Sequence, residues 1–406
     1  MTKAHSKSTR REIPHVALLI ETSLSSGRDI LMGISRFMRT HGRWSVFHQP
    51  RELSEPFPAW LRAWRGDGII ARIQNQRMAK LVAAMKIPAV DVLGVFRHPK
   101  IPLVHVDDHA IGRSVADHLL TRGFRQFGVF GIEKENWAQS RRDAFRNTVI
   151  ASGHDCRIYE IPRLRLQQMP WEQQEHDLVR WLSEIPKPAG IMVSTDDCGL
   201  MLVEACRRSG IRVPDEVAVV GVSNDVIACE LTSPPLSSVN CNLPQVGFEA
   251  AALLDRLMAG KRPPSAPLLI KPLGVVTRLS SDVVAVDDPH VRTAVRFIRE
   301  HACEDIDVNQ IIKHVPMSRS VLQRRFRMLL NRSVHDEIIR CRLQKAIGLL
   351  SESDLAIAQI AEYTGFKYQQ YMNEVFKKYL GESPAMLRLR TKLNNPSGRV
   401  KTTMVK

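Results

Sequence analysis

The hydrophobic pattern changes near residue 289, and this change constrains the fold of the 406-residue chain more than any other feature. From Ile13 to about Arg278, short apolar runs alternate with amphipathic stretches of helical period, which is typical of βαβ units around parallel sheets. After Pro289 the β-type runs stop, and helical periodicity continues to Arg390. The sequence therefore predicts an α/β part followed by an all-α part.

The first βαβ unit is the clearest one. His15–Glu21 is predicted to be a buried strand, Thr22–Gly27 a polar loop and Arg28–His41 a helix. Further strands are expected at residues 44–48, 68–73, 89–93, 103–107, 127–132, 156–161, 190–194 and 217–222. Helices are expected at residues 76–85, 109–122 and 245–260. These strands are too many for one small sheet. Breaks at Pro102–Asp108 and Leu236–Asn242 indicate crossings between two lobes with a cleft between them.

The charge of the chain is strongly basic and unevenly distributed. Lysine and arginine total 58 against 42 acidic residues, which gives a net charge of +16 and a pI near 9.8. The stretch from Pro289 to the C-terminus contains 21 basic and 11 acidic residues, and so carries most of the excess. This balance favours a polyanionic partner such as nucleic acid, with a merely basic enzyme as the alternative.

The helical part contains an internal repeat. Residues 308–315 resemble residues 357–363, and the likeness continues through the segments that follow. The matched pairs are Gln310 and Gln359, Ile311 and Ile360, Phe326 and Phe376, Ser333 and Ser383, and Arg340 and Arg390. Each copy has the pattern of a short helix, a tight turn and a longer basic helix, so the sequence predicts two helix-turn-helix units.

The longer helix of each copy carries polar side chains suited to a DNA groove. The candidates in the first unit are Ser318, which can cap the helix, Arg319, Gln323, Arg324 and Arg327. Those in the second unit, after the turn at residues 364–366, are Lys367, Gln369, Gln370, Asn373, Lys377, Lys378 and Arg388. Glutamine and asparagine can pair with adenine edges, whereas lysine and arginine are suited to phosphates. A solvated helical bundle is the alternative, which two copies with matching turns disfavour.

The all-α part and the α/β part of the chain each resemble a known protein family. Gly365–Arg388 resembles the signature of the AraC/XylS regulators, with Met372 and Leu387 as core residues where that family often has aromatic ones. The first 280 residues, most clearly Val213–Gly221, resemble the ligand-binding core shared by LacI/GalR repressors and periplasmic sugar-binding proteins. The resemblance implies a two-lobed α/β domain of the type I periplasmic-binding-protein-like class, followed by an all-α domain with two helix-turn-helix motifs.

The whole chain resembles the xylose operon regulator family. The likeness includes Asp288-Pro289, Ile298–Cys303 and Met317–Ser320. It implies a regulator that binds double-stranded promoter or operator DNA as a homodimer. It also implies that the regulator responds to a small sugar, most simply a pentose such as D-xylose, and that it activates sugar catabolism genes. Whether the protein activates or represses, and which operator it reads, does not follow from the residues themselves.

A sugar site needs planar polar groups around an apolar or aromatic face, usually from loops at the carboxyl ends of strands. The candidates in such loops are Ser25, Arg28, Arg72, Asp107, Trp137, Arg141, Thr195, Asp196, Ser223, Asn224 and Asp225. The family resemblance implies ligand-binding roles for Arg28, Arg141 and Asp196. Ser223 departs from the resemblance, because these regulators commonly carry Asp there, so D-xylose, another pentose and a related polyol all stay open.

Signals for other chemistry are missing from the sequence. It contains no glycine-rich phosphate loop and no Gly-x-Ser-x-Gly elbow, and His105 falls in a predicted strand, which argues against a metal pair with His109. We expect no catalytic residue, no metal and no cofactor. The main alternative is a sugar-converting enzyme with a basic helical tail that binds nucleic acid.

The expected location is the cytoplasm, in association with the nucleoid. The seven cysteines are scattered, and the apolar run Val16–Ile20 is too short for a signal peptide or a membrane span. We therefore predict no membrane association. The predicted domains are a disordered basic N-terminus (1–12), a sugar-binding and dimerisation domain (13–280), a linker (281–289), an AraC-type DNA-binding domain (290–390) and a basic flexible tail (391–406).

Overall fold

The structure is a computed structural model that describes residues 13–42, 44–50, 58–96, 98–163, 170–283, 288–330 and 332–394. The chain divides into two compact units, Met1–Ala285 and Val286–Lys406. The predicted N-terminal segment 1–12, residues 284–287 of the predicted linker and residues 395–406 of the predicted tail lie outside the described residues.

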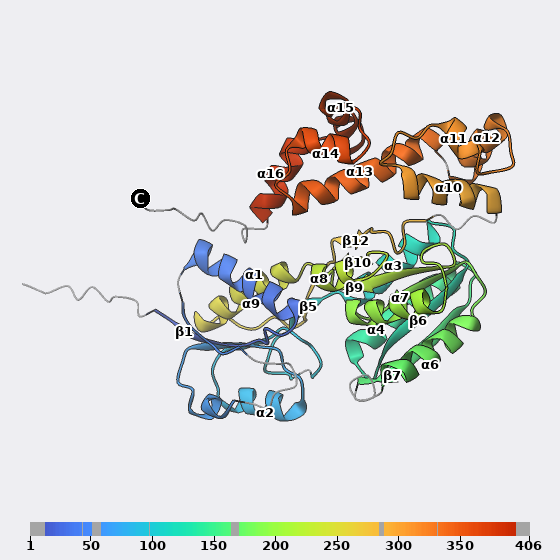
Figure 1. Ribbon diagram of the computed structural model, residues 1–406. Helices are drawn as coiled ribbons and strands as arrows, with labels where there is room; N and C mark the ends of the chain where they lie inside the picture. The colour runs from blue at the N-terminus through green and yellow to red at the C-terminus, as the bar shows by residue number, and fades with distance from the viewer. Residues whose placement is uncertain are drawn as a thin grey trace, which may run out of the picture. The chain divides into compact units, whose positions relative to one another are not determined.

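The first lobe of the α/β unit is a parallel sheet covered by helices on both faces (Figure 1). Its four strands, in the order β2-β1-β3-β4, are β1 (His15–Leu19), β2 (Ser45–His48), β3 (Gly68–Ala71) and β4 (Ala89–Asp91). Its helices are α1 (Ser25–His41), the 3-10 helix η1 (Ala59–Ala63), α2 (Gln76–Ala84) and α9 (Leu243–Met258). Alternate residues of β1 point to opposite faces. Val16, Leu18 and Ile20 therefore pack toward α1 and α9, whereas Ala17 and Leu19 pack toward η1 and α2.

Two glycines allow α1 and α9 to pack closely. A Cβ at Gly33 would lie 1.9 Å from the backbone oxygen of Pro244, and a Cβ at Gly247 would lie 1.9 Å from that of Ile30. These distances are far below van der Waals contact, so any larger residue at either position would push the helices apart. The close packing at Gly33 and Gly247 joins α9 to the first lobe, although α9 comes late in the chain.

The second lobe is a six-stranded sheet in the order β12-β10-β9-β8-β6-β7. The strands are β6 (Gln126–Glu133), β7 (Cys156–Pro162), β8 (Ala189–Val193), β9 (Val217–Val222), β10 (Ser237–Asn240) and β12 (Gly274–Val276). All neighbours are parallel except β12, which is antiparallel to β10. The helices of this lobe are α3 (Asp108–Leu120), α4 (Asn136–Ala151), α6 (Trp171–Ser183), α7 (Asp196–Arg208) and α8 (Val226–Leu231).

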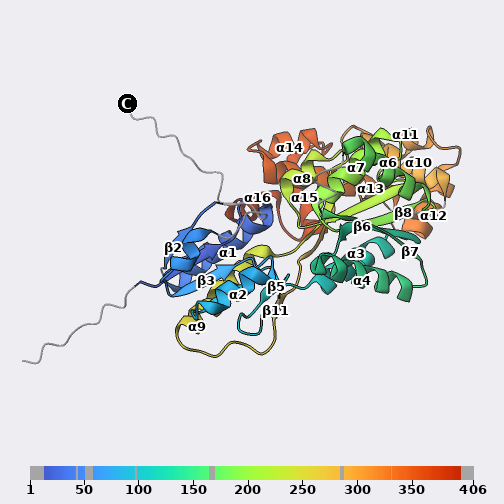
Figure 2. The same ribbon diagram turned by 90° about the horizontal axis from the view of Figure 1, so that it is seen from below.

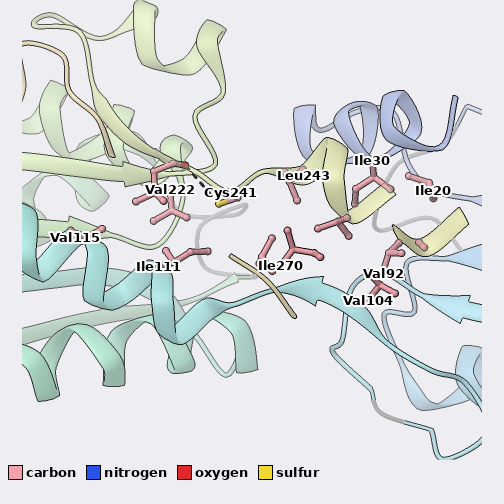
Figure 3. Packing of buried hydrophobic residues seen from close by; sticks show 14 of the residues in the cluster. Ile20, Ile30, Val92, Val104, Ile111, Val115, Val222, Cys241, Leu243 and Ile270 are labelled. Atoms are coloured by element: carbon pink, nitrogen blue, oxygen red, sulfur yellow. Dashed lines mark hydrogen bonds between the residues drawn. The ribbon is translucent and has the colours of Figure 1, made fainter. Parts of the chain in front are cut away.

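The chain crosses between the two lobes three times: after β4, after β10 and after α9. The first and third crossings contain β5 (Val104–Val106) and β11 (Leu268–Ile270), which pair in parallel as a small separate sheet (Figure 2). The hydrophobic core follows these crossings. Figure 3 shows it running from Ile20 and Ile30, past Val104 and Ile270, to Val222 in the second lobe. Packed side chains therefore connect the two lobes.

The second unit is helical. It contains α10 (Pro289–His301), α11 (Val308–Ile312), α12 (Arg319–Leu330), α13 (Val334–Glu352), α14 (Ile357–Tyr363), α15 (Gln369–Leu380) and α16 (Pro384–Asn394). Helix α13 runs between two groups of helices, with α10 to α12 at one end and α14 to α16 at the other (Figure 1). The predicted core residue Phe326 is fully buried in the first group and its repeat partner Phe376 in the second.

Candidate ligand site and nucleic-acid interface

The first lobe places a buried ion pair at the carboxyl ends of β1 and β3. Glu21 is 2% exposed and Arg72 is 9% exposed. The Arg72 Nη1 donates to Glu21 Oε1 and, at 3.1 Å, to the Ser26 hydroxyl. Burial lowers the pKa of Arg72 to about 10; the Asp91 carboxylate opposes this shift, and Arg163 of the second lobe adds to it. Arg72 was predicted as a site residue, whereas Glu21 was assigned only to the strand.

The first turns of α1, which begins at Ser25 and not at the predicted Arg28, also carry predicted site residues. Ser25 is half-buried, and Arg28, which is exposed, donates from Nη1 to the carbonyl oxygens of Thr22 at 2.6 Å and Ser23 at 3.1 Å. Burial raises the pKa of Asp29, the Arg28 charge lowers it, and the Asp225 carboxylate of the second lobe raises it. The Asp225 charge therefore acts on Asp29 from the second lobe.

Arg141 is the most completely held of the predicted ligand residues. It is 7% exposed. Its Nε donates to Asp108 Oδ1 at 2.8 Å, and its Nη1 donates to the Ser194 carbonyl at 3.0 Å. Its guanidinium also lies 4.8 Å from the centre of the Trp137 ring, a cation–π contact. These contacts hold the guanidinium over one face of the indole ring, so the pair supplies the fixed polar group and the aromatic surface that ligand pockets combine.

Asp108 holds Arg141 in place and was not predicted. Burial opposes its ionisation, but the Arg141 charge and the His105 imidazole, whose Nε2 lies 3.3 Å from Asp108 Oδ2, outweigh burial and hold the pKa of Asp108 below its usual range. The neighbouring residue Asp107, which was predicted, instead caps α3 by accepting a hydrogen bond from the Ala110 amide at 2.9 Å. Asp108 could not be singled out because its partner Arg141 is 33 residues away in the chain.

Thr195 and Asp196 begin α7 at the end of β8. The Thr195 hydroxyl caps the helix by accepting a hydrogen bond from the Cys198 amide at 3.3 Å. Asp196 is 3% exposed, and its two carboxylate oxygens accept hydrogen bonds from the Asp225 amide at 2.7 Å and the Ser238 hydroxyl at 2.5 Å. Burial raises the pKa of Asp196 to about 6, and the hydrogen bonds from Ser238 and Asp225 only partly offset this. Asp196 therefore ties the ends of β8, β9 and β10 together.

The loop after β9 holds the other three predicted residues. Ser223 and Asn224 have φ angles of 124° and 54°, in the region that favours glycine. The Asp225 carboxylate caps α8 by accepting hydrogen bonds from the Ile227 and Ala228 amides at 3.1 and 3.4 Å. The Asn224 Oδ1 is buried and has no hydrogen-bond partner among the described residues. The loop thus presents an open acceptor.

The two sets of residues meet where the lobes face each other. The Asn136 amide at the start of α4 donates to the Gly94 carbonyl of the first lobe at 2.8 Å. We call this region the interlobe site. Its first-lobe members are Glu21, Ser26, Arg28 and Arg72, and its second-lobe members are Asp108, Trp137, Arg141, Asp196, Asn224 and Asp225. Carboxylates, guanidinium groups, amides and an indole ring are suited to hydrogen bonding and stacking with a polyhydroxylated ligand.

The helical unit repeats its local interactions as well as its sequence. The Gln310 side chain accepts a hydrogen bond from the Asp307 amide at 2.8 Å, and Gln359 accepts one from the Ala356 amide at 2.9 Å. Ser333 likewise caps the helix that follows it, as its repeat partner Ser383 does. The repeat seen in the sequence therefore consists of structurally equivalent helix-turn-helix units.

Most of the predicted DNA-binding residues lie on α12 and α15, whereas Ser318 and Lys367 precede these helices and Arg388 lies on α16. The exposed ones are Ser318, Arg319, Arg324, Arg327, Lys367, Gln369, Gln370, Lys377 and Lys378. The half-buried ones are Gln323, Asn373 and Arg388. The opposite faces of the two helices pack inward through Leu322 and Met372, both fully buried. Gly365, in the turn of the second unit, has a φ of 75°, as a tight turn requires.

In the part of the chain that the structure describes, no group of three or more histidine, cysteine, aspartate or glutamate side chains is placed to hold a metal ion. Among the described helices, none is both long enough and apolar enough to cross a membrane. The seven cysteines are all free.

Comparisons with known proteins cover almost the whole chain. Residues 15–109 match the XylR N-terminal domain, residues 116–281 the periplasmic binding protein-like domain and residues 311–390 a helix-turn-helix domain. The xylose operon regulatory protein of Haemophilus influenzae is 30% identical over 382 residues, covering 92% of this chain and 98% of that protein. Its namesake from Escherichia coli K12 is 29% identical over 380 residues, covering 91% and 95%. A solved structure of the xylose-binding transcription activator xylR has a TM-score of 0.71 at 28% identity, covering 94% of this chain and 99% of that one.

A periplasmic-binding-protein-like unit followed by two helix-turn-helix repeats defines a sugar-responsive, DNA-binding transcription regulator. The chain belongs to the family of xylose operon regulatory proteins. This membership confirms the predicted fold class and regulatory function. The relatives are regulators, so the alternative of a sugar-converting enzyme is wrong.

Proposed function

We propose that a small sugar, with D-xylose or another pentose as the first candidate, binds at the interlobe site and makes this regulator activate sugar catabolism genes. The observation that carries the proposal is the fixed guanidinium of Arg141 against the Trp137 ring, held by Asp108 at 2.8 Å. The names of the relatives, which are xylose operon regulators and a xylose-binding activator, support the choice of sugar and the activating role.

The sugar contacts come from both lobes. We assign the site to the predicted residues Ser25, Arg28, Arg72, Asp107, Trp137, Arg141, Thr195, Asp196, Ser223, Asn224 and Asp225, and its direct contacts centre on Arg141 and Trp137. A sugar that contacts Arg72 on one lobe and Arg141 on the other binds the closed form better than the open one, and so shifts the population toward closure. Asp107, Thr195 and Asp225 contribute through the helices that they cap, because their side chains are engaged there.

The helical unit reads double-stranded promoter DNA. We assign base contacts to Gln369, Gln370 and Asn373, and phosphate contacts to Lys377, Lys378 and Arg388 in the second unit. In the first unit, we assign base and phosphate contacts to Ser318, Arg319, Gln323, Arg324 and Arg327. Two helix-turn-helix units in one chain suit successive major grooves.

The proposed assembly is a homodimer in the cytoplasm, associated with the nucleoid because its DNA partner is there. We assign dimerisation and sugar binding to residues 13–280 and DNA binding to residues 290–390, with residues 281–289 as the connection. A protein that stays monomeric in solution and on DNA, by analytical ultracentrifugation, would contradict the dimer.

Calorimetric titration of the full chain with pentoses, pentitols and common hexoses tests the ligand. We expect one sugar to bind and Arg141→Ala to weaken it by about 10- to 100-fold, since a hydrogen bond to a charged group contributes about 1.5–3 kcal/mol. Arg207→Ala is the matched control, because Arg207 is exposed on α7 and pairs with Glu204. Equal sugar affinity in wild type and Arg141→Ala would refute the site.

In vitro transcription from the operon promoter tests the activating role. The protein is expected to raise transcript yield in the presence of the bound sugar and not in its absence. A fall in transcript on adding the protein, relieved by sugar, would show a repressor instead.

A further inference from the structure

The Glu21–Arg72 pair of the first lobe has unused hydrogen-bonding capacity. The last ladder pair of β1 and β3 is Leu19 with Ala71. Arg72 is the next residue after Ala71, and Glu21 is the second residue after Leu19. The two side chains bind each other and the Ser26 hydroxyl. Over the described residues, however, Glu21 Oε2 and Arg72 Nε are buried without any hydrogen-bond partner.

An acceptor and a donor left open on two paired side chains call for a partner from outside the chain. A buried polar atom without a partner loses its hydration and gains nothing in return, so such atoms are rare in folded proteins. A buried ion pair is also weak as a purely stabilising device, because removing its charges from water offsets much of their attraction. The carboxyl ends of parallel strands are, by contrast, where α/β sheets bind ligands.

The charges around the pair restrict what that ligand can be. Arg72 is paired with Glu21, Arg141 with Asp108 at 2.8 Å, and Arg163 with Glu135 at 2.8 Å. These three arginines are therefore neutralised by the protein itself. Asp29, Asp196 and Asp225 bring three further carboxylates to the same region, against one further arginine, Arg28. An anionic ligand would meet net negative charge, whereas an uncharged polyol would not.

We propose that Glu21 is a specificity-determining ligand contact: its Oε2 accepts a hydrogen bond from one ligand hydroxyl while Arg72 Nε donates to the neighbouring oxygen. The pair then selects an uncharged ligand with two adjacent hydroxyls and rejects the corresponding sugar acid. This inference rests on the proposed sugar-binding function of the interlobe site, and it adds a residue to that site and a charge rule for the ligand.

Titration of the full chain with D-xylose, xylitol and D-xylonate tests the charge rule. Wild type is expected to bind D-xylose or xylitol at least tenfold more tightly than D-xylonate. Glu21→Gln keeps the side-chain shape and removes the charge. We expect this variant to bind the neutral ligand at least tenfold more weakly and to lose most of the discrimination against the acid. Glu204→Gln, in a Glu–Arg pair on α7, is the matched control and should bind as wild type does.

The outcomes separate this inference from the proposed function. If wild type binds the neutral ligand and Glu21→Gln binds it equally well, the inference fails while the sugar site stands. If wild type binds D-xylonate as tightly as D-xylose, the charge rule fails, and this comparison needs no variant, so it holds even if Glu21→Gln does not fold. If wild type binds none of the three and no sugar of the pentose, pentitol and hexose panel, both proposals fail.

Discussion

The buried carboxylate of Asp196 should make the α/β unit less stable at neutral pH than it would be with an uncharged residue. Burial raises its pKa from 3.8 to about 6. The folded state therefore holds a proton that the unfolded state releases between these two values. The stabilisation from protonated Asp196 is fully present below pH 3.8 and is lost as the pH rises through about 6. One pKa unit corresponds to about 1.4 kcal/mol, so the ionised form costs roughly 3 kcal/mol at neutral pH.

Asp196→Asn should remove this cost while keeping two hydrogen bonds at the position. The amide oxygen can accept from the Asp225 backbone amide, and the amide nitrogen can donate to the Ser238 hydroxyl, which also accepts from the Asn224 amide at 3.0 Å. The Ser238 hydroxyl proton then loses its present acceptor, and this loss subtracts from the gain in stability. We expect the variant to exceed wild type in free energy of unfolding by up to roughly 3 kcal/mol at pH 8. The gap should shrink toward zero as the pH falls to 4.

Urea denaturation followed by tryptophan fluorescence measures the free energy of unfolding of the α/β unit. All six tryptophans of the chain fall between residues 44 and 181, so their emission reports the α/β unit and not the helical one. Asp255→Asn, at an exposed position of α9, is the control for removing a surface charge. The reasoning is refuted if Asp196→Asn is less stable than wild type at pH 8, or if the gap is the same at pH 5 and pH 8.

Three further outcomes are expected. Asp108→Asn should weaken sugar binding by about tenfold in calorimetry because it loosens Arg141, and unchanged affinity would show that Arg141 needs no support. Phe326→Ala and Phe376→Ala should each lower the free energy of unfolding of the helical unit by about 3–5 kcal/mol, because both side chains are fully buried. Each variant should lose operator binding in gel shifts and keep sugar binding. Loss of sugar binding in either would contradict the separation of the two functions. Lys377→Ala should weaken binding to specific and random DNA alike and reduce the slope of log K against log salt by about 0.9, whereas an unchanged slope would remove it from the phosphate contacts.

Periodicity was sufficient to predict most of the fold. The apolar runs gave β1, β6, β8 and β9 almost to their ends, because each is buried on both faces. The internal repeat also predicted structure correctly, since Gln310 and Gln359 make the same capping contact. In these cases the signal is local, so it can be read from neighbouring residues.

The elements that sequence reasoning missed depend on distant partners. β10 contains the letters Ser-Ser-Val-Asn and was interpreted as part of a lobe crossing, yet Ser237 and Ser238 are fully buried. Their hydroxyls donate to the Arg278 carbonyl and the Asp196 carboxylate, which lie about forty residues away. β11 and β12 have three residues each, too short to show alternation. Asp108 and Glu21 were missed for the same reason as β10, because their roles are set by Arg141 and Arg72.

The late position of α9 in the chain has a consequence for synthesis. The first lobe takes its strands from residues 15–91 but one of its covering helices from residues 243–258. While the ribosome is still making the second lobe, the face of the first sheet that carries Val16, Leu18 and Ile70 lacks the cover of α9. The first lobe emerges first and is completed last, so the nascent chain carries an unfinished apolar surface for more than 150 residues of translation, when chaperone protection matters most.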